Sequence, residues 1–208
     1  MNTKRHILEI ALNLFSKRGY SAVSIRDICG QVGIKESTIY YHFKNKQAIF
    51  DTLCDDFLAV SYAIPEKFAV EMAKSTSVTR DTFIKVCKFS FNNYLLDEKI
   101  NKFLRMLIFE QNVNPKAAAL YHKVLFDDAL TEQKKIFGWL IGVGFLKKAN
   151  IDSMVMDYYA PTVFLFHRYL VAGEINETVR KEANKHLDRH IDNFIEKYGK
   201  CKQRKGVQ

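Results

Sequence analysis

Apolar residues recur at spacings of three and four along most of this chain, which is the period of an amphipathic α-helix. Near the start, Leu8, Ala11 and Phe15 share one helical face, and Gly19 follows as a C-terminal cap. Only three prolines and nine glycines occur among the 208 residues, so the turns that a sheet would require are scarce. The pattern predicts an all-α protein.

The first 46 residues are expected to form three short helices. The first of these covers about residues 3–17. Ser24 and Asp27 have the spacing of a capping box, which predicts the start of a second helix that Gly33 ends. A third helix is expected at about residues 35–43. Three helices of this length would make a small N-terminal domain, residues 1–46.

Longer helices are expected in residues 47–208, which we assign to a second, larger domain ending in a disordered tail, residues 200–208. Asn45 is a suitable N-cap for the first helix, and Pro65 and the polar segment 75–79 are expected to separate helices. The further helices predicted are 80–96, 99–112, 115–146, 152–172 and 177–198. The segment 152–172 is apolar nearly all round, so we expect it to be buried on more than one side.

Positive charge is concentrated at the two ends of the chain. Residues 1–50 carry a net charge of +5, residues 197–208 carry another +5, and the whole chain carries +9, which leaves the middle at −1. A basic N-terminal block is what neutralisation of phosphates requires, whereas a near-neutral middle argues against a protein that coats nucleic acid along its whole length. An ordinary solvated face is the alternative for any run of charges.

The cysteines and the apolar segments indicate in which cellular compartment the protein is expected. Four cysteines are scattered without a CxxC pair, which argues against a disulfide framework or a zinc ribbon and favours reduced thiols. The N-terminal segment lacks the small-residue cleavage site of a signal peptide, and the largely apolar segment 158–166 is too short to span a bilayer. We therefore expect a soluble cytoplasmic protein without a membrane partner.

No enzyme signature is recognisable in the sequence. A Gly-rich phosphate loop, a nucleophile elbow, an HExxH motif and paired carboxylates are all missing, so we expect neither an enzyme nor a cofactor. Glu182, His186 and His190 are spaced by four residues, which places three potential metal ligands on one helical face. We favour a solvated face and no metal, because the sequence offers no fourth ligand or supporting shell.

Residues 24–43 have the layout of a helix-turn-helix. Two short helices flank a turn at Gly33, and apolar residues at Ile28, Val32, Ile34 and Ile39 would clamp them together. Such a turn fixes the angle between the helices and leaves the second one able to enter a major groove about 12 Å wide. Short helix pairs occur in many bundles, so the layout alone is only moderately specific.

A series of short motifs makes the assignment more specific. In chain order the motifs are FSKRGY (15–20), SIRDI (24–28), VGI (32–34), STIYYHF (37–43) and NK (45–46). Over about residues 4–53, without gaps, this series closely resembles the N-terminal signature of the TetR family of transcriptional regulators. Beyond residue 53 the resemblance is one of size and helical layout, with a GFL stretch at 144–146 and Asp152 similar to the family's entry to its penultimate helix.

The resemblance implies DNA-contacting roles for residues in and beside the second and third helices. The residues that would hold phosphates are Thr38, Tyr40, His42 and Lys46. The residues that would read base edges are Arg26, Lys35, Glu36, Ser37 and Tyr41. Ser24 and Lys44 complete the set. Ordinary surface chemistry is the alternative for the polar residues, and Tyr40 and Tyr41 could be packing aromatics.

Two positions depart from the family's pattern. Lys35 stands where the family usually has a capping Ser or Thr, so this residue cannot cap the recognition helix but adds a cation next to the groove. Cys29 stands where the family generally has alanine, and we interpret it as a small packing residue. Lys35 and Glu36 together make the operator sequence hard to anticipate.

For the remainder of the chain, the resemblance implies a homodimer formed through the last two helices (about 152–198) and an effector pocket. The protein would repress transcription from a palindromic operator until a small, largely apolar or aromatic effector releases it. The aromatic candidates for the pocket are Phe57, Phe89, Tyr94, Phe103, Phe109, Tyr121, Trp139, Tyr158 and Phe166. The alternative is a DNA-binding protein of the same fold that responds to a protein partner or to no ligand.

Overall fold

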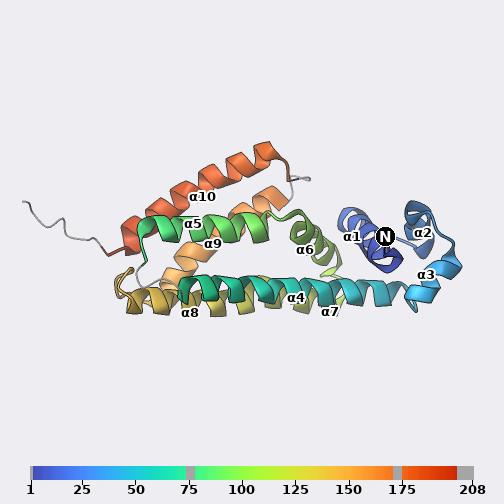
Figure 1. Cartoon of the computed structure of the whole chain (residues 1–208), viewed down its shortest axis with the longest axis horizontal. Coiled ribbons are helices and arrows are strands. Elements are labelled where there is room, and N and C mark those ends of the chain that lie inside the picture. The colour runs from blue at the N-terminus through green and yellow to red at the C-terminus, as the bar shows by residue number, and fades with distance from the viewer. Residues whose placement is uncertain (1, 74–77, 171–174, 201–208) are drawn as a thin grey trace, which may run out of the picture. The chain divides into compact units, whose positions relative to one another are not determined.

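A computed structural model describes residues 2–73, 78–170 and 175–200, with all side chains in these ranges except those of residues 62–73 and 170. Within the described residues every regular element is a helix, and a single isolated bridge joins Leu146 to Gly199. The all-α prediction is therefore confirmed (Figure 1). The helices are α1 (Thr3–Arg18), α2 (Ile25–Val32), α3 (Glu36–His42), α4 (Lys46–Ala73), α5 (Arg80–Ser90), α6 (Glu98–Glu110), α7 (Pro115–His122), α8 (Ala129–Gly142), α9 (Ile151–Leu170) and α10 (Glu177–Tyr198), with π-helical segments η1 (Phe91–Leu95) and η2 (Lys123–Asp128).

The N-terminal head, α1–α3, is delimited by the caps that the sequence predicts. Ser24 Oγ accepts a hydrogen bond from the Asp27 N–H (3.1 Å), and the Asp27 carboxylate accepts one from the Ser24 N–H (2.7 Å), so the capping box is complete. Gly33 ends α2 in the left-handed conformation at φ +77°. α3 begins after Lys35, whose ammonium cannot accept a hydrogen bond from the first turn.

The described residues cluster into two compact units, of which the first comprises residues 1–64 and 97–127. It contains the head, the first part of α4, α6 and α7, and α1 packs against both α2 and α6. Its largest fully buried side chains are Phe15, Phe50, Phe57, Phe103, Ile7, Ile28, Ile39, Ile49 and Leu53. The two helices of the predicted helix-turn-helix thus contribute Ile28 and Ile39 to a core that continues into α4 and α6.

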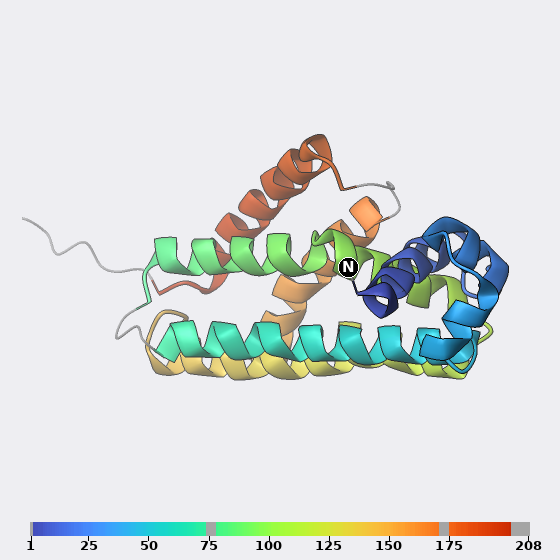
Figure 2. The ribbon, with the colours of Figure 1, turned by 45° about the vertical axis from the view of Figure 1, so that its right-hand side comes forward.

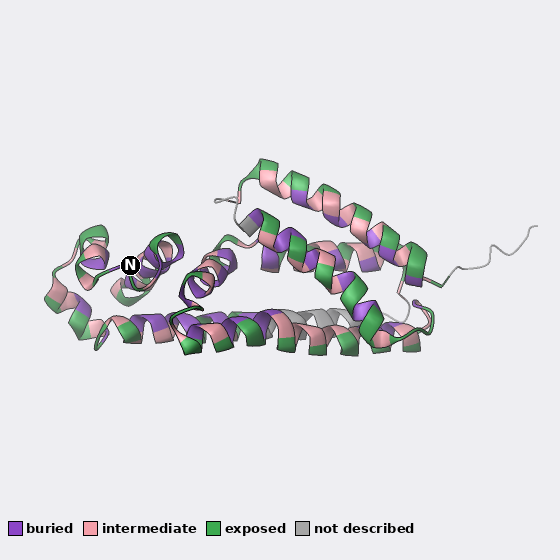
Figure 3. Ribbon diagram, turned by 180° about the vertical axis from the view of Figure 1, so that it is seen from behind, coloured by how far each residue is buried: buried purple, intermediate pink, exposed green. Residues whose placement is uncertain are grey.

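The second unit comprises residues 65–96 and 128–208. α9 packs against α8 and α10, and α10 packs against α5. An aromatic cluster fills the interior, with ring centroids between 5.2 and 6.5 Å apart among Phe83, Phe137, Tyr158 and Phe194. In Figure 3, α9 and α10 each alternate buried with exposed positions along their length.

α5 and α10 run in opposite directions (Figure 2), and polar contacts link α5 and the segment that follows it to α10. Asn92 and Asn184 exchange two hydrogen bonds of 2.8 Å, which satisfies both amides. The other contacts are Arg80–Asp192 (2.6 Å), Lys88–Asp188 (2.7 Å) and the Arg180 guanidinium on the Leu96 carbonyl (2.8 Å). Together these contacts fix the position of α10 along α5.

The helix expected at 80–96 is present as α5 and η1, which together cover residues 80–95, with a π-helical last part. The helix expected at 115–146 begins at Pro115 but is a succession of α7, η2 and α8 that ends at Gly142. α4 continues through Pro65, although the boundary between the two compact units falls at that residue. Residues 74–77 of the expected polar joint, and residues 201–208 of the expected tail, lie outside the described residues.

The spacing of apolar residues did not predict the π-helical segments, because it does not reveal a change from i→i−4 to i→i−5 hydrogen bonding within a helix. The spacing also does not reveal whether a helix continues through a proline. In α9, Pro161 lies inside the helix. The hydroxyl of the next residue, Thr162, donates to the Tyr158 carbonyl at 2.9 Å. Local propensity is thus overridden by tertiary packing.

Two glycines of the head provide a matched test of the backbone. Gly33→Ala is expected to lower the free energy of unfolding by about 1–2 kcal/mol, because alanine is strained at φ +77°. Gly30→Ala, inside α2 with open space around the added methyl, is expected to raise it by up to about 1 kcal/mol. Urea unfolding of both variants checks the signs, and equal effects would contradict the assigned conformations.

Candidate nucleic-acid interface

α3 separates an apolar face from a polar one. Ile39 and Phe43 are buried, whereas Tyr41 is 86% exposed and Tyr40 is 52% exposed. The remaining predicted contacts on and beside α3 are exposed (Lys35, Ser37 and Lys44) or half-buried (Glu36, Thr38 and His42). The head therefore holds α3 by one side and presents the predicted DNA-contacting residues on the other. Because Tyr40 and Tyr41 are exposed, packing within the head does not explain these two aromatic side chains.

Two of the predicted base-reading residues contact each other. Arg26 Nε in α2 lies 2.9 Å from Glu36 Oε1 in α3, and both side chains are at least partly exposed. An exposed ion pair of this kind contributes at most about 1 kcal/mol, so it orients the two side chains more than it stabilises the head. Ser24, another predicted contact, is exposed at the N-terminus of α2 while its hydroxyl caps the helix.

Lys46 has an internal role that the sequence did not reveal. Its ammonium donates to the carbonyl oxygens of Tyr20 (2.8 Å) and Val23 (2.7 Å) and lies 4.2 Å from the centroid of the Tyr20 ring. Desolvation lowers the pKa of Lys46 from its ordinary value. The first residue of α4 is thus bonded to the turn between α1 and α2.

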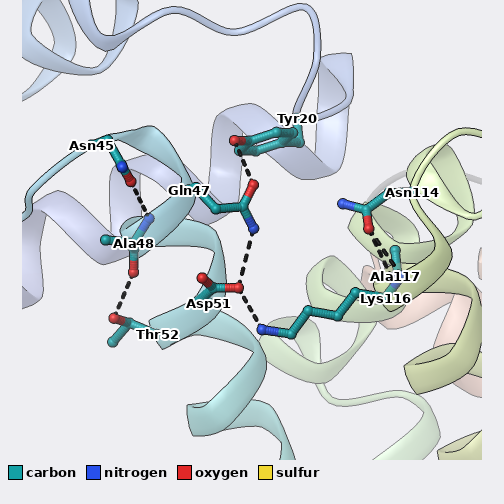
Figure 4. Close-up of polar contacts among 9 residues, drawn as sticks. All are labelled: Tyr20, Asn45, Gln47, Ala48, Asp51, Thr52, Asn114, Lys116 and Ala117. Carbon is teal, nitrogen blue, oxygen red and sulfur yellow. Dashed lines mark hydrogen bonds and ion pairs between the residues drawn. The ribbon is translucent and has the colours of Figure 1, made fainter.

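A second polar chain connects the same turn to α4 and α7 (Figure 4). The Tyr20 hydroxyl donates to Gln47 Oε1 (3.0 Å), and Gln47 Nε2 donates to Asp51 Oδ1 (3.1 Å). Lys116, near the start of α7, forms an ion pair with the same Asp51 oxygen. The hydrogen bond from Lys116 lowers the pKa of Asp51, and Asn45 caps α4 by accepting from the Ala48 N–H (2.8 Å). No sequence motif marks this chain, because its members are brought together only by tertiary packing.

The nine aromatic candidates for an effector pocket are divided between the two units. Phe57, Phe103, Phe109 and Tyr121 belong to the first, and the other five, Phe89, Tyr94, Trp139, Tyr158 and Phe166, belong to the second. Phe57 and Phe103 stack with centroids 5.2 Å apart. Phe89 is 60% exposed and Phe109 is 51% exposed. Within either unit the structure therefore brings only some of the nine residues together.

The three residues considered as metal ligands on α10 have separate surroundings. His190 Nε2 lies 2.8 Å from the Tyr158 carbonyl oxygen, and Glu182 lies 3.5 Å from Arg168. Among residues 2–73, 78–170 and 175–200, no three His, Cys, Asp or Glu side chains are placed to hold a metal ion. In the same ranges, no helix combines the length and apolar character needed to cross a membrane.

Comparison with known proteins agrees with this geometry. Residues 7–53 match the family model described as bacterial regulatory proteins, tetR family. The uncharacterised HTH-type transcriptional regulator YerO of Bacillus subtilis is 23% identical over 205 residues, covering 94% of this chain. The chain spans 66% of the length of that relative, slightly less than two thirds.

Two solved structures share the fold over nearly their whole length. A TetR-family regulator of Mesorhizobium loti has a TM-score of 0.71 at 18% identity, covering 95% of this chain and 96% of that one. The SmeT–triclosan complex has a TM-score of 0.68 at 18% identity, covering 97% of this chain and 94% of that one. At this level of identity the likeness concerns the fold alone.

Proposed function

We propose that this chain, whose residues 7–53 match the model of bacterial regulatory proteins of the tetR family, is a DNA-binding transcriptional regulator and not an enzyme. It would be a homodimeric repressor that a small, largely apolar or aromatic effector releases from a palindromic operator. The observation that carries the proposal is the exposed polar face of α3, held from behind by Ile39 and Phe43. We assign DNA reading to residues 1–46 and dimerisation with effector binding to residues 47–208.

The contacts with DNA fall into two groups. Five side chains hold phosphates, and they set the affinity but not the sequence preference. They belong to Thr38, Tyr40, His42, Lys44 and Lys46. The groups that read bases are Arg26, Lys35, Glu36, Ser37 and Tyr41, with Ser24 at the start of α2. Because Arg26 and Glu36 are paired in the free protein, reading a base with either one requires that their ion pair opens or shifts.

Dimerisation uses the outer faces of α9 and α10. Met156 is 54% exposed and Phe164 is 64% exposed, and with Ala160 between them they form a stripe at a spacing of four residues along α9. Large apolar side chains in a row on a helix that is buried on its other side favour a self-complementary interface. Two recognition helices about 34–36 Å apart would then match successive major-groove half-sites.

The effector would act through α4, which begins at the head and extends into the second unit. A tilt of this helix changes the separation of the two heads in the dimer. A near-complete switch requires about 5.5 kcal/mol of differential affinity between the two states.

Effector contacts are proposed for the nine aromatic residues named above. SmeT, which shares the fold, forms a complex with triclosan, a small aromatic compound, and this supports the proposed effector class. Control by a protein partner is the alternative.

Replacing single lysines separates phosphate contacts from base contacts. Lys44→Ala is expected to weaken binding to all duplexes and to reduce the slope of log K against log salt by about 0.9, the value of one phosphate contact. Lys35→Ala is expected to change the preferred sequence when random duplexes are selected on the protein. Lys181→Ala, an exposed lysine of α10, is the control and should change neither quantity. An unchanged slope for Lys44→Ala would remove Lys44 from the interface.

The dimer surface is tested by charging one exposed phenylalanine. Phe164→Glu is expected to convert the dimer to monomers, because two carboxylates would be buried without partners across the symmetry axis. Sedimentation equilibrium measures the mass. The matched control is Phe89→Glu, which changes an equally exposed phenylalanine of α5 and should leave the mass unchanged. A dimeric Phe164→Glu protein would place the interface elsewhere.

The effector class is tested with triclosan as the probe. At a hundred times its dissociation constant, a ligand stabilises the folded state by about 2.7 kcal/mol. For a chain of this size that corresponds to a rise in Tm of about 5–10 °C. Trp139 is the single tryptophan of the chain, so its fluorescence reports binding independently, with Trp139→Phe as the control. No response to triclosan or to a panel of small aromatic compounds would favour the alternative of a DNA-binding protein that responds to a protein partner or to no ligand.

A further inference from the structure

The last residue of α6, Glu110, is a buried carboxylate in the first unit. Only 3% of its surface is exposed. Burial of a charged group is costly unless it is paired and hydrogen-bonded, and the C-terminal end of a helix disfavours negative charge. This side chain therefore needs specific partners to remain where it is.

Those partners lie in the turn between α1 and α2. Glu110 Oε1 accepts from the Ser21 N–H (3.2 Å), and Glu110 Oε2 accepts from the Ser21 hydroxyl (3.0 Å). Gly19, at φ +80°, allows the approach, because a Cβ added there would lie 3.2 Å from Glu110 Oε1. Two hydrogen bonds to one residue, with room made by a glycine, define a docking point for α6 on this turn.

α4 contacts the carbonyl groups of the same turn. Lys46 donates to the Tyr20 and Val23 carbonyls, so the turn gives an N–H to a carboxylate and two carbonyls to an ammonium. The negative charge of Glu110 raises the pKa of Lys46, against the larger effect of desolvation. The chain from Tyr20 through Gln47 and Asp51 to Lys116 adds a contact to α7 (Figure 4).

The turn leads directly into the DNA-reading helices. Ser24, the N-cap of α2, follows Val23, so the position of residues 20–23 sets where α2 begins and hence where α3 lies. We propose that Glu110 is a positioning residue for DNA binding: it fixes the helix-turn-helix against α6 without touching DNA. This inference rests on the proposed function of α3.

The experiment compares substitutions at both ends of α6. Glu110→Met removes the acceptor and keeps the length of the side chain, and Glu110→Gln keeps an oxygen for the Ser21 N–H. Glu98→Met is the matched control in the first turn of α6, where the side chain is exposed and pairs with Lys102. The readouts at 25 °C are the hydrogen exchange of the Ser21 amide by NMR, the Tm, and the affinities for the selected operator and for a random duplex.

If Glu110 positions the head, Glu110→Met speeds exchange at Ser21 and lowers operator affinity by roughly 2- to 30-fold, with little change for the random duplex. Glu110→Gln restores most of the affinity, and Glu98→Met behaves as the wild type. Ser21→Ala, at an exposed position, is the second variant and is expected to lose part of the affinity should Glu110→Met fail to fold.

Wild-type operator affinity in Glu110→Met, or in Ser21→Ala if the former is unfolded, would overturn the inference. A lower Tm with unchanged affinity would likewise show a structural role only. Failure of the wild-type protein to select any duplex would overturn the proposed function and with it the positioning role. The hydrogen exchange of Ser21 would then still show whether the contact between α6 and the turn exists.

Discussion

The hydrogen bonds from the Lys46 ammonium to the Tyr20 and Val23 carbonyls hold the start of α4 to the head. Hydrogen bonds to a charged donor contribute about 1.5–3 kcal/mol each, and these two satisfy backbone groups at a turn that lies between helices. Without them, α1 and α2 would be joined to α4 by the chain, by apolar contacts, which are less directional, and by the hydrogen bond from the Tyr20 hydroxyl to Gln47. The placement of α3, and therefore the reading of DNA, depends on this polar joint.

The joint also explains why a three-helix head is insufficient by itself. The core that buries Ile28 and Ile39 continues into Phe50 of α4 and Phe103 of α6, so the first compact unit includes residues distant in sequence. A domain of about 46 residues would bury too little apolar surface to be stable without such support. The proposed functional division after residue 46 therefore does not coincide with the division of the chain into two compact units.

In the second unit, polar contacts fix the register between α5 and α10, that is, how far one helix is shifted along the other. The paired amides of Asn92 and Asn184 are half-buried and flanked by ion pairs, while the aromatic cluster of Phe83, Phe137 and Phe194 supplies the burial. Apolar contacts tolerate sliding by a turn, whereas reciprocal amide bonds do not. An α10 held in this way can present a fixed outer face to a second copy.

The sequence by itself determined the local structure of the head. The Ser24 capping box, the left-handed Gly33 and the Asn45 cap act within four residues, so their spacing alone predicts them. The helix expected at 177–198 is α10, with the same bounds. The motif series over residues 15–46 indicated the resemblance to the TetR family for the same reason, and residues 7–53 match that family's model. Only the tertiary structure decided the π-helical segments, the continuation of α4 through Pro65, and the contacts of Glu110 and Lys46 with one turn. The contacts of Lys46 and Glu110 join residues 23 to 89 positions apart in the chain, and short-range periodicity carries no information about such contacts.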